Sequence, residues 1–237
     1  MVSKTSLRES VRAHRWAEVA EGLAARPDLL GVRDERGRGW LHQACMAPAA
    51  DAGAAIRTAD LLLGLGLGLN DAAFTEGAWK ATPLWHAVSR GRNLALVEHL
   101  LKLGCDPDYC LFAAAWNEDR AAIRLLLAHG ADIEEGAARG ETPLLGAIAW
   151  SKFGPAEELL IGGANPDFQD PKGRTALHLM LKKGSAAEHF AMFVRHGARG
   201  DIPDGEGRTA AELLRRKRDP GYHAVADRLA QASTVSR

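Results

Sequence analysis

The sequence predicts an all-α fold, a solenoid of about seven helix-turn-helix units joined by short hairpin fingers. Two observations predict it. First, a motif built around Thr recurs along the chain, and its copies at Thr142, Thr175 and Thr209 are 33 and 34 residues apart. Second, units close with a Leu-rich run that ends in Gly, as in the segment 125–130. A repeat of this length cannot bury its apolar face alone, so neighbouring units must stack to form a core.

Each unit is expected to begin with a capped helix. The Thr hydroxyl caps the first helix, and the Pro of Thr82-Pro83 or Thr142-Pro143 occupies a first-turn position where no hydrogen bond is lost. The Gly after the Leu run suits the left-handed conformation that ends the second helix. We place the unit starts near residues 5, 39, 82, 108, 142, 175 and 209. They form a single repeat domain over 5–232, with short tails at 1–4 and 233–237.

The fullest copy of the motif reads Asp-Pro-Lys-Gly-Arg-Thr-Ala-Leu-His over 170–178, and related copies span 34–42 and 80–85. This motif resembles the Thr-Pro-Leu-His signature of the ankyrin repeat, whose period is about 33 residues. The resemblance covers nearly the whole chain. It implies an extended concave face that binds partners and seldom carries chemistry. It also implies that the signature histidines, His42 and His178, bond neighbouring backbone and hold adjacent hairpins together.

The centre of the chain departs from the repeat. The finger over 71–81 is expected to be longer than its counterparts, and the finger before Asp108 is absent. Together these two features predict a notch floored near Ser89 and Trp116, into which a partner's side chain or loop inserts. The second unit also carries five extra residues, which we place in the Ala-rich stretch around 48–53.

Composition limits the classes of function. The formal net charge is zero, with 30 basic and 30 acidic residues, so overall charge gives no attraction to nucleic acid or membranes. Three cysteines, Cys45, Cys105 and Cys110, argue against a disulfide framework and favour a reducing compartment. The N-terminal sequence has no apolar stretch typical of a signal peptide. No segment approaches the ~20 apolar residues that a membrane-spanning helix needs. We therefore expect a cytoplasmic protein.

No motif in the sequence indicates catalysis, and we expect neither an enzyme nor a bound cofactor or metal. Cys105 and Cys110 are five residues apart, but no second pair of ligands accompanies them as a zinc site requires. The glycines at 64, 66 and 68 end a repeat instead of joining a strand to a helix, so they do not form a phosphate-binding loop.

The resemblance implies contact positions three and one residues before each signature Thr, and seven and eight after it. Without the finger positions of the units at 5 and 108, these positions hold 24 residues, of which twelve are basic and two are acidic. Trp116 and Trp150 occupy equivalent positions and are expected to stack side by side, whereas Trp16, Trp40 and Trp85 are expected to pack inside. Trp and Arg are enriched in binding hot spots. The predicted partner-binding residues are Arg36, Arg38, Trp79, Ser89, Arg90, Trp116, Arg139, Glu141, Trp150, Lys172, Arg174, Lys182, Lys183, Arg208, Arg216 and Lys217.

The sequence therefore predicts a non-enzymatic module, monomeric when unbound, that captures an acidic partner protein on a basic, Trp-bearing face. Composition and family analogy also favour an inhibitor or an immunity protein that neutralises a bacterial toxin. One alternative is binding of nucleic acid or a phosphorylated ligand on the same face, with bases stacked on Trp. Another is a secreted effector directed at a host, for which no export signal is visible.

Overall fold

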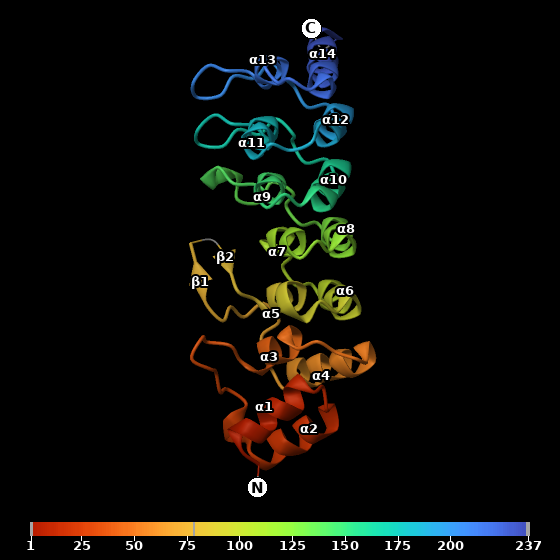
Figure 1. The fold of residues 1–237 in the computed structure, drawn as a ribbon. Helices are drawn as coiled ribbons and strands as arrows, with labels where there is room; N and C mark the ends of the chain where they lie inside the picture. The colour runs from red at the N-terminus through yellow and green to blue at the C-terminus, as the bar shows by residue number, and fades with distance from the viewer. Residues whose placement is uncertain (1, 78, 236–237) are drawn as a thin grey trace. The chain divides into compact units, whose positions relative to one another are not determined.

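The computed structural model describes residues 2–77 and 79–235 and confirms the all-α fold of consecutive helix pairs (Figure 1). Contacts divide the described chain into two compact units. The first comprises residues 1–117 with 128–131, and the second comprises 118–127 with 132–237. None of the helices in the described part of the chain has the length and apolar composition to span a bilayer.

The first unit pairs short inner helices, which carry the signature, with longer outer helices. Its fingers project on the side of the inner helices α3 and α5, away from the outer helices α4 and α6 (Figure 1). The turn η2 continues α5 as a π-helix. The elements of this unit are α1 (Lys4–Arg12), α2 (Trp16–Ala25), η1 (Pro27–Leu29), α3 (Trp40–Met46), α4 (Ala52–Gly64), β1 (Thr75–Glu76), β2 (Trp79–Lys80), α5 (Pro83–His86), η2 (Ala87–Gly91), α6 (Leu94–Lys102) and α7 (Cys110–Trp116).

The second unit repeats this arrangement, with fingers beside the inner helices α11 and α13 (Figure 1). Phe190 and Phe193 of the outer helix α12 are fully buried in its core, as is Leu144 of α9. The elements of this unit are most of α8 (Arg120–Ala128), then η3 (Ala137–Arg139), α9 (Pro143–Ala149), α10 (Phe153–Ile161), α11 (Ala176–Lys183), α12 (Ala187–Arg195), α13 (Ala210–Arg215) and α14 (Pro220–Val235).

Hydroxyl caps start α5, α9 and α13 as predicted, whereas the Thr175 hydroxyl before α11 contacts Nδ1 of His178 at 2.9 Å in place of a backbone N–H. Thr82, Thr142 and Thr209 each accept a hydrogen bond from the backbone N–H three residues later, at 3.2, 3.2 and 3.3 Å. Such a cap stabilises a helix by about 1 kcal/mol. The first helix differs, because Ser3 caps α1 and Thr5 lies inside it. The expected cap at Thr5 is therefore wrong by two residues.

Helical structure also extends beyond the predicted limits of 5–232. The helix α1 begins at Lys4 and α14 ends at Val235, while Met1 and residues 236–237 of the predicted tails lie outside the described residues. The extra length of the second repeat is divided between the loop before α4 and α4 itself, which has 13 residues against nine in α6.

The long finger over 71–81 forms as predicted. Thr75 pairs with Lys80 and Glu76 with Trp79 in an antiparallel hairpin. Before α7, the described chain has only a turn, and Tyr109 stands at the N-cap with a left-handed φ of 62°. The predicted missing finger is thus confirmed, and the notch beside it stays a prediction.

Of the three tryptophans expected inside the repeats, one is buried, one is half-buried and one is exposed. Trp40 is buried, and its Nε1 donates a hydrogen bond of 2.7 Å to the carbonyl oxygen of Leu29. Trp85 is half-buried. Trp16 is 42% exposed, so the expectation that it packs inside is wrong. It is the first residue of α2, and the apolar side chains that this helix buries, Val19 and Leu23, come later along the helix.

Candidate partner-binding face

Three fingers share the sequence Asp-x-x-Gly-Arg, at 34–38, 170–174 and 204–208. In each, the Asp N–H donates to the Arg carbonyl oxygen, at 3.0, 2.9 and 2.9 Å. One carboxylate oxygen of the Asp accepts the backbone N–H groups of the third and fifth residues. The other accepts a hydrogen bond from the Arg side chain, at 2.8, 2.8 and 3.1 Å. We call this arrangement the Asp–Arg finger.

Two features at Gly173 explain why the fourth position of the Asp–Arg finger is Gly. Its φ of +71° is left-handed, and a Cβ atom there would lie 2.7 Å from the backbone nitrogen of Gly205. The neighbouring finger comes this close because the Gly205 N–H donates a hydrogen bond of 2.9 Å to the carbonyl oxygen of Lys172. The last two fingers are therefore joined through their backbones.

The Arg of each Asp–Arg finger is neutralised by its own finger. Arg38, Arg174 and Arg208, all predicted to bind a partner, have side chains 16%, 25% and 45% exposed. The excess of basic residues counted from the sequence is therefore too large, because the pairing Asp residues lie outside the 24 positions. Sequence reasoning missed these acids, although an Asp four residues before an Arg, with Gly between them, was the available signal. They are Asp34, Asp170 and Asp204.

The finger carboxylates are held ionised. Hydrogen bonds from the side chain and then the backbone N–H of Arg208 lower the pKa of Asp204 to about 2. Partial burial raises the pKa of Asp170, but the hydrogen bonds that it accepts from the side chain and backbone of Arg174 outweigh this effect, and its pKa is lowered overall. Both ion pairs are thus present at neutral pH.

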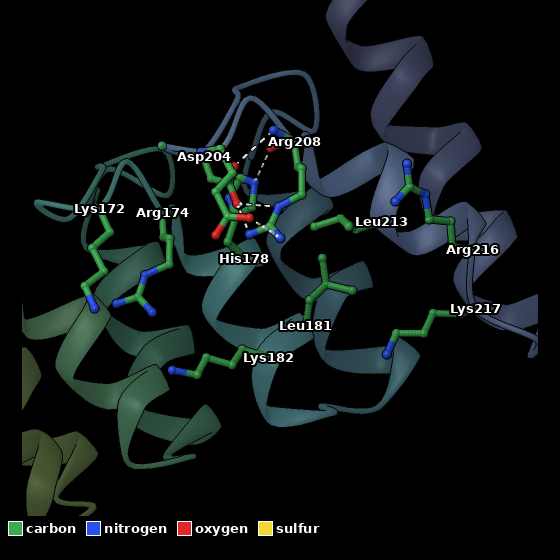
Figure 2. Close-up of a pocket in the computed structure, with 12 residues that line it drawn as sticks. Lys172, Arg174, His178, Leu181, Lys182, Asp204, Arg208, Leu213, Arg216 and Lys217 are labelled. Atoms are coloured by element: carbon green, nitrogen blue, oxygen red, sulfur yellow. Dashed lines mark hydrogen bonds and ion pairs between the residues drawn. The ribbon is translucent and has the colours of Figure 1, made fainter.

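A pocket of about 630 Å³ opens between the last two Asp–Arg fingers and the inner helices α11 and α13 (Figure 2). We call it the basic pocket. His178, Leu181 and Leu213 contribute to its lining, together with Asp204 and Glu206. Six of the predicted partner-binding residues also line it, namely Lys172, Arg174, Lys182, Arg208, Arg216 and Lys217.

Four cations of the basic pocket have no carboxylate partner within the described residues. They are Lys172, Lys182, Arg216 and Lys217, all exposed, whereas Arg174 and Arg208 are paired as described above. Figure 2 shows Lys172 on one side of the pocket and Arg216 with Lys217 on the other. Uncompensated cations around one hollow favour an anionic ligand.

The signature histidines support the fingers, as the resemblance implied. His178 Nδ1 accepts the backbone N–H of Thr175 at 3.2 Å, so its Nε2 carries the proton and donates to the carbonyl oxygen of Arg208 at 3.0 Å. This bond connects α11 to the last finger below the basic pocket. In the first unit, His42 Nε2 bonds the carbonyl oxygen of Asp71 at 2.8 Å in the same way.

An aromatic cluster joins the long finger of the first unit to α5, with Phe74 and Trp79 on the finger and Trp85 on the helix. The Trp79 ring meets Phe74 edge to face at 5.1 Å and Trp85 at 5.0 Å between centroids. Trp79 is half-buried and Phe74 is 41% exposed. The predicted contact residue Trp79 therefore also packs its own finger onto α5.

Two more predicted residues, Ser89 and Arg90, lie in the π-helical turn η2. Arg90 is exposed, and Ser89 is half-buried. Two carbonyl groups of this turn bind the side chain of Asn117. Its Nδ2 donates hydrogen bonds to the carbonyl oxygens of Val88 and Ser89 at 3.1 and 3.0 Å. This contact fixes the floor of the predicted notch to the residue that follows α7.

The other predicted residues are distributed over both units. In the first unit, Trp116 is 58% exposed at the end of α7, and Arg36 lines a smaller pocket of about 270 Å³. In the second unit, Trp150 is half-buried at the end of α9, and Lys183 donates to the carbonyl oxygen of Ala149 at 2.6 Å. Arg139 and Glu141 are exposed. The stacking of Trp116 on Trp150 and the binding roles of all these residues stay predictions.

The cysteines do not provide a reactive site. All three are buried and free of disulfides. Burial raises the pKa of Cys105 to about 12 and that of Cys45 further above its usual range. Within the described residues, no group of three or more His, Cys, Asp or Glu side chains is placed to hold a metal ion.

Comparison with known proteins identifies the repeat. A family model of three ankyrin repeats matches residues 41–137. The fold is similar to that of the human ASB11 ankyrin repeat domain, with a TM-score of 0.70 and 22% identity over 94% of this chain and 96% of the other. It is equally similar to the ankyrin repeat domain of Bcl-3, with a TM-score of 0.70 and 20% identity over 93% and 97%. Residues 41–137 therefore match the ankyrin-repeat family, and the described chain has the ankyrin-repeat fold.

Bacterial proteins are also among those that resemble this chain. An ankyrin repeat domain from Acinetobacter baumannii has a TM-score of 0.62 and 22% identity, covering 81% of this chain and 97% of the other. Protein PhlB of Serratia liquefaciens is 37% identical over an alignment of 94 residues, and the match covers 36% of this chain and 41% of PhlB. Ankyrin repeats form protein-interaction scaffolds that are typically non-enzymatic, and the family match indicates no catalytic family.

Proposed function

We propose that this protein acts in the cytoplasm by capturing an acidic partner protein on its fingers and inner helices. The observation that carries the proposal is the basic pocket. Six residues predicted from repeat position line this one hollow, and four of its cations lack a carboxylate partner within the described residues. Complementary charge of this kind steers a partner and fixes its register.

We further propose that capture inhibits the partner, as an immunity protein neutralises a toxin. A module without a catalytic family of its own acts on a partner by occupying its surface. The similarity to Protein PhlB of Serratia liquefaciens and to an ankyrin repeat domain from Acinetobacter baumannii supports a bacterial setting for this role. An inhibitor of this kind is expected to be monomeric when unbound, so that its contact face is open.

A charge-reversal experiment tests capture. The chain is immobilised as wild type, as Lys182→Glu/Lys217→Glu, and as the control Arg195→Glu/Arg228→Glu, whose exposed cations lie on the outer helices α12 and α14. Both double variants change the net charge equally. A lysate from cells of the source organism is passed over each. Mass spectrometry then identifies the proteins that wild type and control retain but that Lys182→Glu/Lys217→Glu, the pocket variant, loses. A partner retained equally by all three overturns the proposal.

Nucleic acid is the competing ligand, because the same cations attract phosphates. Two measurements separate the classes. Capture of a protein must survive nuclease treatment of the lysate. Binding to a single-stranded oligonucleotide is measured across a salt series, because affinity that depends on released counterions falls steeply with salt. Tight oligonucleotide binding lost in the pocket variant, together with nuclease-sensitive capture, overturns the protein-partner proposal.

A further inference from the structure

The charge of the tip residue is not the same in all three Asp–Arg fingers. The third position holds Arg36 in the first of these fingers, Lys172 in the next and Glu206 in the last. Glu206 therefore brings a second carboxylate, beside the buried Asp204, to a pocket whose other charged lining residues are Lys and Arg. Its side chain is 71% exposed, so burial does not hold it in place.

The carboxylate of Glu206 occupies one edge of Arg208. Nε and Nη2 of Arg208 contact Asp204 Oδ2 at 3.1 and 2.8 Å, and the Asp204 side chain is 4% exposed. Nη1 of Arg208 lies 2.6 Å from Oε2 of Glu206. The first pairing is built into the finger. The second is a surface ion pair between exposed groups, which contributes little stability and breaks readily.

The preceding finger shows the same atom without a partner. Arg174 pairs with Asp170 through Nε and Nη2, as Arg208 pairs with Asp204. Nη1 of Arg174 has no hydrogen bond or ion pair with any described residue, because the tip residue there is Lys172 and not an acid. Of the two finger arginines that line the basic pocket, Arg174 thus presents an open edge, whereas the same edge of Arg208 is covered by Glu206.

We propose that the basic pocket binds an acidic peptide segment of the partner, and that Glu206 is an internal competitor that a partner carboxylate displaces from Arg208. This inference rests on the proposed function and identifies the chemistry of its site. Glu206 marks where a ligand carboxylate sits. Its displacement leaves Asp204 in place, so the finger keeps its structure when the ligand binds.

Several carboxylates fit the pocket better than a single phosphate. The cations come from different elements, with Lys172 on a finger, Lys182 on α11, and Arg216 and Lys217 after α13, and Figure 2 shows them on opposite sides of the hollow. A phosphate site instead brings donors to one point, usually with backbone N–H groups. Leu181 and Leu213 line the pocket as apolar surface on which the methylene stems of ligand side chains pack.

The test uses the full chain and a hexaglutamate peptide as the probe. Binding is followed at low ionic strength by nitrogen-15 NMR, which resolves the Arg Nε–H signals. Glu206→Gln removes the competing charge and keeps the shape of the side chain. Glu188→Gln is the matched control, because Glu188 is 81% exposed on the outer helix α12 of the same unit and its replacement changes the net charge equally.

We expect the peptide to shift the Nε–H signal of Arg208 and to bind Glu206→Gln about two- to fivefold more tightly than wild type, the factor set by one exposed ion pair. Glu188→Gln should bind as wild type does. Lys172→Gln and Lys217→Gln should weaken binding. Pyrophosphate at the same concentration, which presents a single compact anion, should cause smaller shifts in the pocket.

Three outcomes overturn the inference. They are the absence of pocket shifts with hexaglutamate, equal affinities of Glu206→Gln and Glu188→Gln, and stronger binding of pyrophosphate than of the peptide. Failure of the proposed function is distinguishable from these. Loss of partner capture in the pocket variant without any effect of Glu206→Gln overturns the competitor role alone. A peptide response without any captured protein overturns the function and leaves the carboxylate site in place.

Discussion

Oδ2 of Asp170 accepts a hydrogen bond of 2.8 Å from Nε of Arg174, while Oδ1 accepts the backbone N–H groups of Lys172 and Arg174 at 2.9 Å each. One carboxylate thereby fixes both the backbone of the finger and the direction of the Arg side chain. The charged side chain and the loop that presents it are ordered by the same acid. The finger consequently presents its tip residue in a defined position before any partner arrives.

Asp170→Ala is expected to destabilise the protein by about 1–3 kcal/mol, because two backbone donors and a guanidinium lose their acceptor. Urea unfolding followed by circular dichroism measures the change. Glu188→Ala is the control, and as an exposed substitution it should stay within about 0.5 kcal/mol of wild type. Equal stability of the two variants would show that water replaces the carboxylate without cost.

His86 should make the protein sensitive to mild acid. Burial, and then the charge of His42 when protonated, lower its pKa from the ordinary 6.5 to about 3, and its Nδ1 has no hydrogen-bond partner among the residues that the structure describes. In the unfolded chain the pKa of His86 keeps its ordinary value of 6.5. Between about pH 3 and pH 6.5 the unfolded chain therefore binds more protons than the folded chain. Stability is therefore fully present above about pH 6.5 and is lost as the pH falls below it. The loss at pH 5 is about 2 kcal/mol.

The variant His86→Leu separates this effect from general acid unfolding. Free energies of unfolding are measured by urea titration at pH 7.5 and pH 5 for both proteins. The difference between the two pH values should be smaller in the variant, whatever its absolute stability. An unchanged difference would assign the pH dependence to other groups, such as His14 and His42, whose pKa values burial also lowers.

Trp116 and Trp40 should respond differently to truncation. Trp116 is 58% exposed, so Trp116→Ala should leave the melting temperature nearly unchanged and cost roughly 2–4 kcal/mol of partner binding. Trp40 is 2% exposed, so Trp40→Ala should lower stability by about 3–5 kcal/mol. Thermal melting and calorimetry on the same samples give both quantities. If Trp116→Ala binds the partner as wild type does, the first unit contacts its partner elsewhere.

Rim charges should act on the rate of association. Arg36 and Lys217 are exposed in the first and second unit, so Arg36→Glu and Lys217→Glu should slow association with an acidic partner and flatten its dependence on salt. Stopped-flow fluorescence at several salt concentrations measures both effects. Arg228→Glu on α14 provides a control of equal charge. If these substitutions change only the dissociation rate, both residues lie in the buried part of the interface.

The repeat architecture could be predicted because one period imposes the same caps, glycines and apolar positions many times over. Thr82, Thr142 and Thr209 all cap helices as expected, and the hairpin over 71–81 follows from its extra length. The first cap was misplaced at Thr5 because the motif is worn there, and two serines at positions 3 and 6 form the cap in its place.

The candidate site was predictable by position but not by charge. Repeat register identified Lys182 and Lys217 as contact residues, and both line the basic pocket. Counting charge along the register failed for Arg174 because the acid that neutralises it, Asp170, stands outside the contact positions. The π-helical turn η2 could not be foreseen either, because no local sequence rule marks the point where a helix accommodates an extra residue.

The Asp–Arg finger has a consequence for how this protein changes over evolution. Its internal hydrogen bonds use the Asp carboxylate, the Gly and the backbone, and none of them requires a particular side chain at the third position, where Arg36, Lys172 and Glu206 stand. A mutation there can exchange one charge for another without disturbing the loop. Natural selection can therefore follow a changing partner at that position one residue at a time, with little penalty in folding.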